Sequence, residues 1–338
     1  MASIKEIAEI CGVSVATVSK ALNDKGDISD KTKQMVKEKA KELGYFPQYY
    51  AKAMRMNRSF NLGVLFVDKA MSGLTHDYFA NILNSFKDTA EERGYDITFI
   101  NCHDDKAHKK TYLEHCRYRG LDGVVIACID FEAPEVIELV SSDIPVVTID
   151  KAFNNRVSVL SDNSVGMRSL VEYIISMGHK KIAYIYGENT DVTAQRRESY
   201  EKALKFHNIS LVSEYYISSQ YRSLQKAAEY TKELMKLPNP PTCIIYPDDY
   251  SSIGGINELR KMGLKIPDDI SVAGYDDIFI AGQLVPRLTT VHQDTKMIGW
   301  IAANKLIEMI EGKSVFYRPI TVKSKLMTGE TVADLNIR

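Results

Sequence analysis

The stretch that decides how this chain folds is Val13-Ser14-Val15-Ala16-Thr17-Val18-Ser19-Lys20-Ala21-Leu22-Asn23, close to the N-terminus. Ser14 is a favoured helix N-cap, and Val18 and Leu22, four positions apart, give the following helix one apolar stripe. The remaining positions carry hydroxyl groups, small side chains and one lysine. This pattern predicts a short helix that packs on one side and presents its first turn outward.

A first helix is expected immediately before this stretch. Its apolar positions recur at i, i+3, i+4 and i+7: Ile4, Ile7, Ala8 and Cys11. Ser3 and Glu6 form a capping box at its start, and Gly12 ends it. Two short helices joined by a glycine-containing turn form the helix-turn-helix pattern, whose second helix presents its N-terminal residues to the DNA major groove.

The chemistry of the second helix indicates what each side chain can contact. The hydroxyl groups of Thr17 and Ser19 suit phosphate oxygens, as does the helix N-terminus. Val15 and Ala16 are small enough to touch thymine methyl groups, and Lys20 can reach a guanine or a phosphate. The alternative from these residues alone is a small helical packing module with a solvated polar face.

A third helix is expected from its N-cap, Ser29, to Gly44, which can take the positive φ of a helix C-terminus. Val36, Ala40 and Leu43 share its apolar face, so three helices close a small bundle. We therefore expect a DNA-binding domain over residues 1–46. Residues 47–59 form a linker that is too short to be a stable helix alone, and we expect it to fold only against a partner or DNA.

Composition and charge limit the class of protein. The chain has 338 residues, enough for two or three domains, and its five cysteines are scattered, which favours reduced thiols. It has neither a long apolar run nor a signal-peptide pattern, so we expect a cytoplasmic protein with no membrane partner. Residues 1–58 hold 11 Lys and Arg against 7 Asp and Glu, whereas the remainder holds 32 against 37. A basic head on an acidic body suits a localised phosphate-binding surface.

From about Phe60 the sequence alternates between apolar, β-branched runs and amphipathic segments of helix length, the pattern of βαβ units around a parallel sheet. The expected strands fall into two sets: Leu62–Val67, Ile97–Ile100, Val124–Ile126 and Val146–Ile149, then Lys181–Tyr186, Cys243–Tyr246 and Ile270–Tyr275. The fold class is therefore an α/β body of two doubly wound lobes. Ligands bind such sheets at the carboxyl ends of the strands.

Several aspartates follow these strands directly: Asp68, Asp150, Asp248, Asp249, Asp276 and Asp277. Carboxylates combined with an arginine and aromatic rings suit a sugar, whose hydroxyls need acceptors and whose C–H face needs a flat apolar surface. The alternative for each aspartate is a helix N-cap, as Asp162 before Asn163-Ser164-Val165-Gly166 illustrates.

The sequence offers no pattern for catalysis, a cofactor or a metal. Phosphate-binding glycine loops and nucleophile elbows are absent from it. Cys102-His103-Asp104-Asp105 fits no standard zinc or iron spacing, and a polar loop after a strand explains it. Gly254-Gly255 is interpreted as a site of close packing. We therefore expect neither an enzyme nor a bound metal or cofactor.

The chain resembles the LacI/GalR family of bacterial transcription regulators over essentially its whole length. The matching phrases are Ile4-Lys5-Glu6-Ile7-Ala8 continuing through Val13–Asn23, Leu43-Gly44-Tyr45-Phe46-Pro47, Leu121-Asp122-Gly123, Gly178-His179-Lys180-Lys181-Ile182-Ala183, Pro267–Asp277 and Pro286–Val291. This resemblance implies a periplasmic-binding-protein-like body over residues 60–338. Its N-lobe is expected at about 60–160 and 290–322, and its C-lobe at about 161–289 and 323–338.

The resemblance also implies a homodimer whose paired linkers become helices in the minor groove of a near-palindromic operator. The residue matching Met54 would act there as an apolar wedge, although methionine is more flexible than the usual leucine. The complete set of expected DNA-binding residues is Ser3, Ser14, Val15, Ala16, Thr17, Ser19, Lys20, Asn23, Ser29, Ala51 and Met54. The chain stops without leucine heptads, which favours a dimer over a tetramer.

Effector contacts are carried over from the family position by position: Tyr78, Phe79, Asp150, Asp162, Arg196, Tyr221, Asp248 and Asp276. Arg197 stays open as a second anchor, because Ser199 replaces the family's glycine nearby. Asp248 stands where asparagine is frequent, which should alter the choice of ligand.

The resemblance implies a transcriptional repressor whose operator affinity is switched by a small molecule between the lobes, which we expect to be a sugar or sugar derivative. The alternative within the family is a catabolite-control-type global regulator that uses a phosphorylated carrier protein as co-regulator. From another class, a solute-binding protein of a transporter would share the two lobes but would need a signal peptide and no DNA-binding head.

Overall fold

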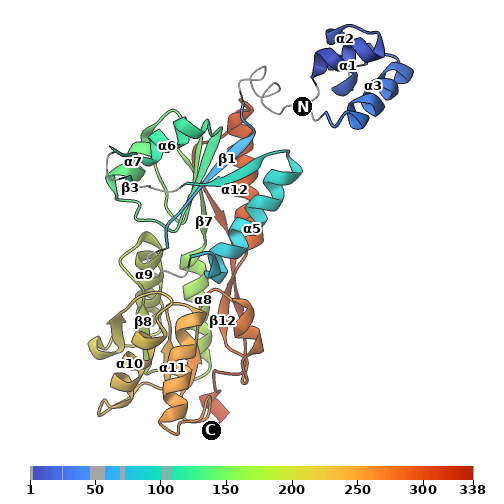
Figure 1. Cartoon of the computed structure of the whole chain (residues 1–338). Coiled ribbons are helices and arrows are strands. Elements are labelled where there is room, and N and C mark those ends of the chain that lie inside the picture. Colours follow the sequence, from blue (N-terminus) through green and yellow to red (C-terminus); the bar gives the residue numbers. More distant parts are fainter. Residues whose placement is uncertain are drawn as a thin grey trace. The chain divides into compact units, whose positions relative to one another are not determined.

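The structure is a computed structural model that describes residues 3–24, 26–45, 58–68, 73–100, 104–105 and 108–337. The chain divides into two compact units, Met1–Ser59 and Phe60–Arg338, whose helices and strands are labelled in Figure 1. Most of the expected linker helix over residues 47–59, including Ala51 and Met54, lies outside the described residues.

The described residues of the first unit form three short helices, α1 (Ile4–Cys11), α2 (Val15–Leu22) and α3 (Asp30–Glu42). Their starts follow the capping chemistry of the sequence: Ser3 and Glu6 form the capping box of α1, and Ser14 and Ser29 cap α2 and α3. The helices share one core of buried side chains: Ile7, Ala8, Val18, Ala21, Val36 and Ala40. Because all three helices contribute, each depends on the other two for burial of its apolar face.

The N-terminal lobe of the second unit is built on a parallel sheet of order β13-β7-β6-β5-β1-β2. Its strands are β1 (Asn61–Phe66), β2 (Asp96–Phe99), β5 (Gly123–Ala127), β6 (Val146–Ile149), β7 (Val157–Ser161) and β13 (Pro319–Val322). Helices α5 (Asp77–Glu92) and α12 (Thr295–Ile310) cover one face, and α6 (Tyr112–Arg119) and α7 (Pro134–Ser141) cover the other. Alternate residues of β1 serve the two cores, Leu62 and Val64 on one face and Leu65 on the other.

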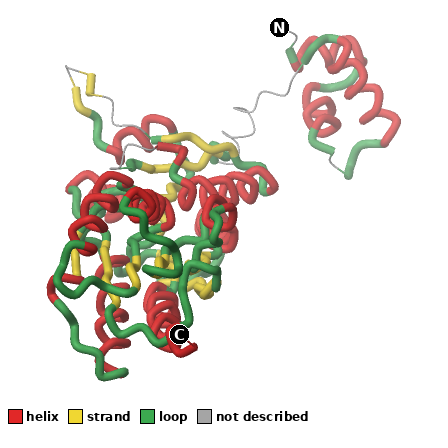
Figure 2. Tube along the Cα trace, turned by 90° about the horizontal axis from the view of Figure 1, so that it is seen from below, coloured by secondary structure: helices red, strands yellow, loops and turns green. Residues whose placement is uncertain are grey.

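The C-terminal lobe has a smaller parallel sheet of order β11-β10-β8-β9. Its strands are β8 (Ile182–Tyr186), β9 (Tyr216–Ser218), β10 (Cys243–Ile245) and β11 (Ser271–Ala273). One face packs on α8 (Asn163–Ser176) and α9 (Asp191–Phe206), and the other on α10 (Leu224–Met235) and α11 (Asp249–Lys261). Figure 2 shows helices and strands interleaved throughout this unit, as expected of an α/β fold.

Smaller elements complete the described structure: the antiparallel pairs β12 (Thr290–Gln293) with β14 (Ser324–Met327) and β3 (Asp104–Asp105) with β4 (His108–Lys109), and the 3-10 turns η1 (Gly73–Thr75), η2 (Ser213–Tyr215), η3 (Phe279–Gln283) and η4 (Leu335–Ile337). In the described ranges, no helix combines the length and apolarity needed to cross a bilayer.

The chain passes between the lobes three times, after β7, after β12 and between β13 and β14. Strand β12 packs with the C-terminal lobe, because Val291 lies in its core and Thr289 bridges to Ala273. The sequence had assigned residues 290–293 to the N-terminal lobe, so the second crossing comes a few residues later than expected. The crossing shifts because Val291 is buried in the core of the C-terminal lobe. The local sequence pattern does not show which lobe buries this residue.

Close packing explains the paired glycines of α11. A Cβ at Gly255 would overlap the Tyr246 hydroxyl, and one at Gly254 would overlap the backbone of Leu224. The packing interpretation of Gly254-Gly255 is therefore confirmed.

Candidate functional site

The leading turn of α2 is exposed on the helical unit. Ser14, Val15 and Ala16 are exposed, and Val15 keeps 42% of its surface accessible although it is apolar. Ser14 Oγ accepts a hydrogen bond from the Thr17 backbone N–H at 3.0 Å and lies 2.9 Å from Thr17 Oγ1. The cap therefore fixes two of the expected DNA-contacting hydroxyls at the helix N-terminus.

The last turn of α2 carries side chains with partners inside the unit. Lys20 Nζ lies 2.5 Å from Asp27 Oδ2, and Asn23 Nδ2 donates to the Ser19 carbonyl at 2.6 Å. Lys20 and Asp27 are both about half exposed, with side-chain exposures of 49% and 56%. Such an exposed ion pair contributes little free energy, so a phosphate can replace Asp27 at small cost.

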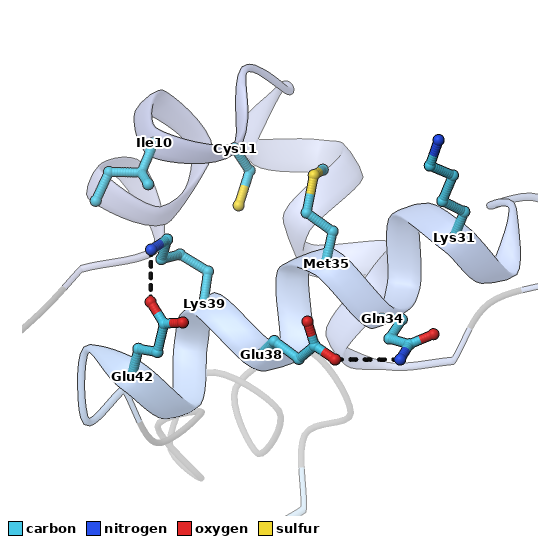
Figure 3. Close-up of a pocket in the computed structure, with 8 residues that line it drawn as sticks. All are labelled: Ile10, Cys11, Lys31, Gln34, Met35, Glu38, Lys39 and Glu42. Carbon is cyan, nitrogen blue, oxygen red and sulfur yellow. Dashed lines mark hydrogen bonds and ion pairs between the residues drawn. The ribbon is translucent and has the colours of Figure 1, made fainter.

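A hollow of about 480 Å³ lies between α1 and α3, as Figure 3 shows. Its lining residues are Ile10, Cys11, Lys31, Gln34, Met35, Glu38, Lys39 and Glu42, with Gln34 bonded to Glu38 and Lys39 to Glu42. This set contains none of the expected DNA-binding residues. The face that α2 presents is thus separate from this hollow.

In the second unit, Asp150 follows β6 at the carboxyl end of the N-terminal sheet. It takes a left-handed backbone conformation with φ of 65°. The Tyr78 hydroxyl, from α5, donates to Asp150 Oδ2 at 3.1 Å. Burial raises the pKa of Asp150 to about 6, against the lowering effects of the Tyr78 hydrogen bond and the Arg196 charge.

Arg196 projects from α9 and is 3% exposed. Its Nε donates to Asn163 Oδ1 at 2.8 Å and its Nη1 to the Pro247 carbonyl at 3.2 Å. The guanidinium carbon lies 3.5 Å from the centre of the Tyr275 ring, a cation–π contact. These contacts hold the arginine in one orientation, with Nη2 directed towards Asp276 Oδ1 at 3.9 Å.

Asp276 belongs to the loop after β11 and also has a positive φ, 107°. Gln293 Nε2 donates to its Oδ1 at 2.6 Å. Burial is the main cause that raises the pKa of Asp276 to about 7; Arg196 opposes it, and the charges of Asp248 and Asp150 reinforce it. Asp150 from one lobe and Asp276 from the other therefore lie close enough to influence each other.

Two of the expected effector aspartates serve as helix N-caps. Asp162 accepts from the Val165 N–H at 3.0 Å at the start of α8. Asp248 caps α11 and accepts from the Ser251 N–H at 2.7 Å, the Ser251 hydroxyl at 2.9 Å and the Arg222 N–H at 2.8 Å. The capping alternative thus describes their contacts, and a direct role in ligand binding stays a prediction.

The expected aromatic residues Tyr221 and Phe79 lie in different environments. Tyr221 is held by a 2.8 Å hydrogen bond between its hydroxyl and Thr193 Oγ1, and its ring lies directly against Gly187. Phe79 is 9% exposed and packs in the core of the N-terminal lobe, with its ring centre 5.7 Å from that of Phe66. Tyr221 is therefore better placed than Phe79 to offer a ring face to a ligand.

Arg197 lies away from this group of residues. Its Nε donates to the Tyr216 hydroxyl at 2.8 Å, and its guanidinium carbon lies 4.6 Å from the centre of the Tyr186 ring. Of the two adjacent arginines, only Arg196 contacts the residues around Asp276. The expectation of a second anchor at Arg197 is therefore not supported by its contacts.

A cavity of about 590 Å³ adjoins the site between α5, α12 and the loop after β11. Tyr78 and Asp276 line it, together with Gln293, and the other six expected effector residues do not. Its volume falls within the range of about 300–1,000 Å³ that is usual for small-molecule sites.

Two pairs of charged side chains link the lobes. Arg222 Nη1 lies 3.0 Å from Asp77 Oδ2, and Arg222 Nη2 donates to the Thr75 carbonyl at 3.2 Å. Lys151 lies 3.1 Å from Asp191. These contacts were missed from the sequence, which contains no local signal for a pair separated by 145 positions.

Asp249, one of the aspartates that the sequence places at a strand end, is fully buried. Thr290 Oγ1 donates to its Oδ1 at 2.6 Å and the Ile278 N–H to its Oδ2 at 3.0 Å. Burial raises its pKa well above the usual range, and the Asp276 charge adds to the effect. It ties α11 to the segment that carries Asp276, so it positions that carboxyl group.

A helix-turn-helix unit joined to two doubly wound lobes that enclose converging polar side chains defines a DNA-binding regulator with a ligand-binding body. Residues 3–48 match the description "Bacterial regulatory proteins, lacI family", and residues 171–332 match "Periplasmic binding protein-like domain". The chain belongs to the LacI family of bacterial transcription regulators, which act by binding DNA and are not enzymes.

Three known proteins illustrate the relationship. The probable HTH-type transcriptional repressor ExuR of Bacillus subtilis (strain 168) is 32% identical over 99% of this chain and 99% of its own. The lac repressor dimer bound to operator and the anti-inducer ONPF is 23% identical, covers 98% of this chain and 99% of its own, and superposes with a TM-score of 0.83. The transcriptional regulator CelR in complex with cellobiose is also 23% identical, over 98% of this chain and 100% of its own, with a TM-score of 0.69.

Proposed function

We propose that this protein is a homodimeric transcriptional repressor whose affinity for a near-palindromic operator is set by a sugar or sugar derivative bound between its lobes. The observation that carries this proposal is the convergence of Arg196 and Asp276 from one lobe with Asp150 from the other. The solved relatives support it, one as an operator-bound dimer and one as a cellobiose complex. A repressor that acts on bacterial DNA would work in the cytoplasm.

The hydrogen-bonding capacity of this group favours a ligand rich in hydroxyls. Arg196 Nη2 is 3.9 Å from Asp276 Oδ1, too far for a hydrogen bond, so a ligand hydroxyl beside the pair can bond to both atoms. Asp150 supplies acceptors, and Tyr221 supplies a flat ring. A polyol offers donors and acceptors together, which matches one guanidinium facing two carboxyl groups.

The inter-lobe contacts suggest how binding is transmitted. Arg222–Asp77 and Lys151–Asp191 hold the lobes together, and three chain crossings connect them. A ligand that contacts both lobes favours one inter-lobe arrangement. That arrangement sets the separation of the two linkers in the dimer and therefore the affinity for operator DNA. Coupling of this kind is typically about 1–3 kcal/mol, and it must act equally in both directions.

A matched pair of arginine variants tests the proposal. Arg196→Gln should weaken effector binding by about tenfold to a hundredfold, because a charged hydrogen bond contributes about 1.5–3 kcal/mol. Arg197→Gln, one position away on the same helix, should leave effector binding unchanged. Operator affinity is measured by fluorescence anisotropy with and without effector, and the effector is found by thermal-shift screening of sugars, sugar phosphates and nucleobases.

Both variants should bind operator DNA in the absence of effector, since neither residue belongs to the helical head. An effector response that survives in Arg196→Gln, with wild-type affinity, would rule out the proposed cleft. Asp150→Asn, which keeps the shape of the side chain, provides a second test if Arg196→Gln is poorly folded.

The catabolite-control alternative predicts that operator affinity depends on a partner protein. In that case a phosphorylated carrier protein, rather than a sugar alone, would raise operator affinity. Adding such a carrier, in phosphorylated and unphosphorylated forms, to the anisotropy assay distinguishes the two functions.

A further inference from the structure

Three potential metal ligands meet in the N-terminal lobe, outside the group around Arg196. Asp68 follows β1, Cys128 follows the adjacent parallel strand β5, and His76 immediately precedes α5. One ligand atom from each side chain lies within 4.8 Å of the other two. Cys128 Sγ is 4.0 Å from Asp68 Oδ1.

The setting of His76 is not explained by helix capping. It occupies the N-cap position of α5, yet its side chain makes no capping hydrogen bond. Its Nδ1 is buried and has no hydrogen-bond partner among the described residues. An imidazole nitrogen of this kind can coordinate a metal ion through its lone pair.

The backbone of Cys128 directs its side chain towards the other two residues. Cys128 has a positive φ of 50°, uncommon for a residue other than glycine.

We propose that Asp68, His76 and Cys128 bind a divalent transition metal of the Zn²⁺ class. One nitrogen, one sulfur and one oxygen donor form a set that zinc accepts, whereas magnesium and calcium require oxygen ligands. Tetrahedral zinc at bond lengths of about 2.0–2.3 Å places its ligand atoms about 3.5 Å apart, so small side-chain rotations suffice. Three protein ligands leave a fourth position for water or for a group of a bound ligand.

The three residues adjoin the proposed effector site, since the His76 ring centre lies 4.9 Å from that of Phe79. Metal binding can still be measured without the effector, so the two proposals can fail separately. The metal site also differs from the Cys102-His103-Asp104-Asp105 segment, which the sequence analysis rejected as a metal motif. The residues proposed here are far apart in the sequence and come together only through the pairing of β1 with β5.

The test uses the full-length protein, freed of affinity tag and treated with chelator, and titrates it with Co²⁺ and then Zn²⁺. Co²⁺ should bind at one equivalent per chain and produce a thiolate-to-metal charge-transfer absorption, which Zn²⁺ then displaces. Cys128→Ser should abolish this absorption. His76→Asn should weaken Zn²⁺ binding at least about tenfold, because even loss of an outer-sphere partner commonly costs that much.

Control variants identify the source of the signal. Cys11→Ser, Cys102→Ser and His292→Asn should each keep the charge-transfer band and the wild-type affinity. A band that persists in Cys128→Ser, or that disappears in Cys102→Ser, would overturn the proposal, as would the lack of any thiolate band in the wild type. Circular dichroism and operator binding of each variant confirm that a lost band does not come from unfolding.

Discussion

Replacing Asp276 by asparagine should stabilise the protein at neutral and alkaline pH. The pKa of Asp276 rises from 3.8 to about 7 in the folded state, chiefly because burial disfavours the charged form. Between these values the folded protein holds a proton that the unfolded chain has lost, so stability falls as the pH rises from about 4 to about 7. Asparagine keeps an oxygen for the Gln293 hydrogen bond but never ionises.

The magnitude follows from the same two values. The difference between 3.8 and about 7 corresponds to at most about 4 kcal/mol, at about 1.4 kcal/mol for each pH unit. Asp276→Asn should therefore match the wild type near pH 4 and exceed its free energy of unfolding by up to about 4 kcal/mol near pH 8. The attraction to Arg196 is already included, since it lowers the pKa and reduces the net effect.

Urea unfolding measured at a series of pH values provides the assay. Trp300, the single tryptophan, lies in α12, so its fluorescence reports the body and not the helical head. Asp143→Asn is the control: this carboxylate is exposed, and its pKa is lowered by Arg117, so the variant should gain no stability at high pH. If the difference between Asp276→Asn and wild type did not change with pH, the carboxyl group would not be buried as described.

Three further substitutions test packing, hydrogen bonding and capping. Gly255→Ala should destabilise the body by about 1–3 kcal/mol or more, because its new methyl group overlaps a tyrosine hydroxyl, whereas Gly282→Ala, with open space around it, should change urea stability by less than about 0.5 kcal/mol. Tyr78→Phe removes a donor to Asp150 and should cost about 1–3 kcal/mol in the same assay at neutral pH; an unchanged midpoint would contradict that hydrogen bond. Ser14→Ala removes the N-cap of α2 and should cost about 1 kcal/mol in the thermal unfolding of the head, followed by circular dichroism, and also weaken operator binding.

The sequence predicted the helical head closely, because its determinants are local. Capping by Ser3, Ser14 and Ser29 involves atoms within three residues, and the apolar stripes repeat at the helical period. The buried strands of the body were visible for a similar reason, as continuous β-branched runs. Strand β7 was missed because its alternating serines look solvent-facing, yet Ser158 is buried and lies 2.8 Å from Thr148 Oγ1.

The chemistry of the cleft was only partly predictable. The sequence placed aspartates at strand ends, and their capping alternative was stated for each, but the number of donors reaching Asp248 depends on Arg222, a residue 26 positions away. Likewise, the resemblance selected Arg196 and left Arg197 open as a second anchor, because the local pattern does not show which arginine turns inward. Packing of Arg196 on Tyr275 decides that.

The sequence by itself determined the helical head, the alternation that produces two lobes, and the residue types available for binding. Tertiary structure alone decided which carboxyl groups share one environment, that Arg197 turns away from them, and that Asp68, His76 and Cys128 meet. The physical reason is the distance along the chain over which each interaction acts. Capping and helical periodicity act within a few residues, whereas burial and charge depend on every segment that the fold brings close, and pKa shifts and ligand sets follow from those two quantities.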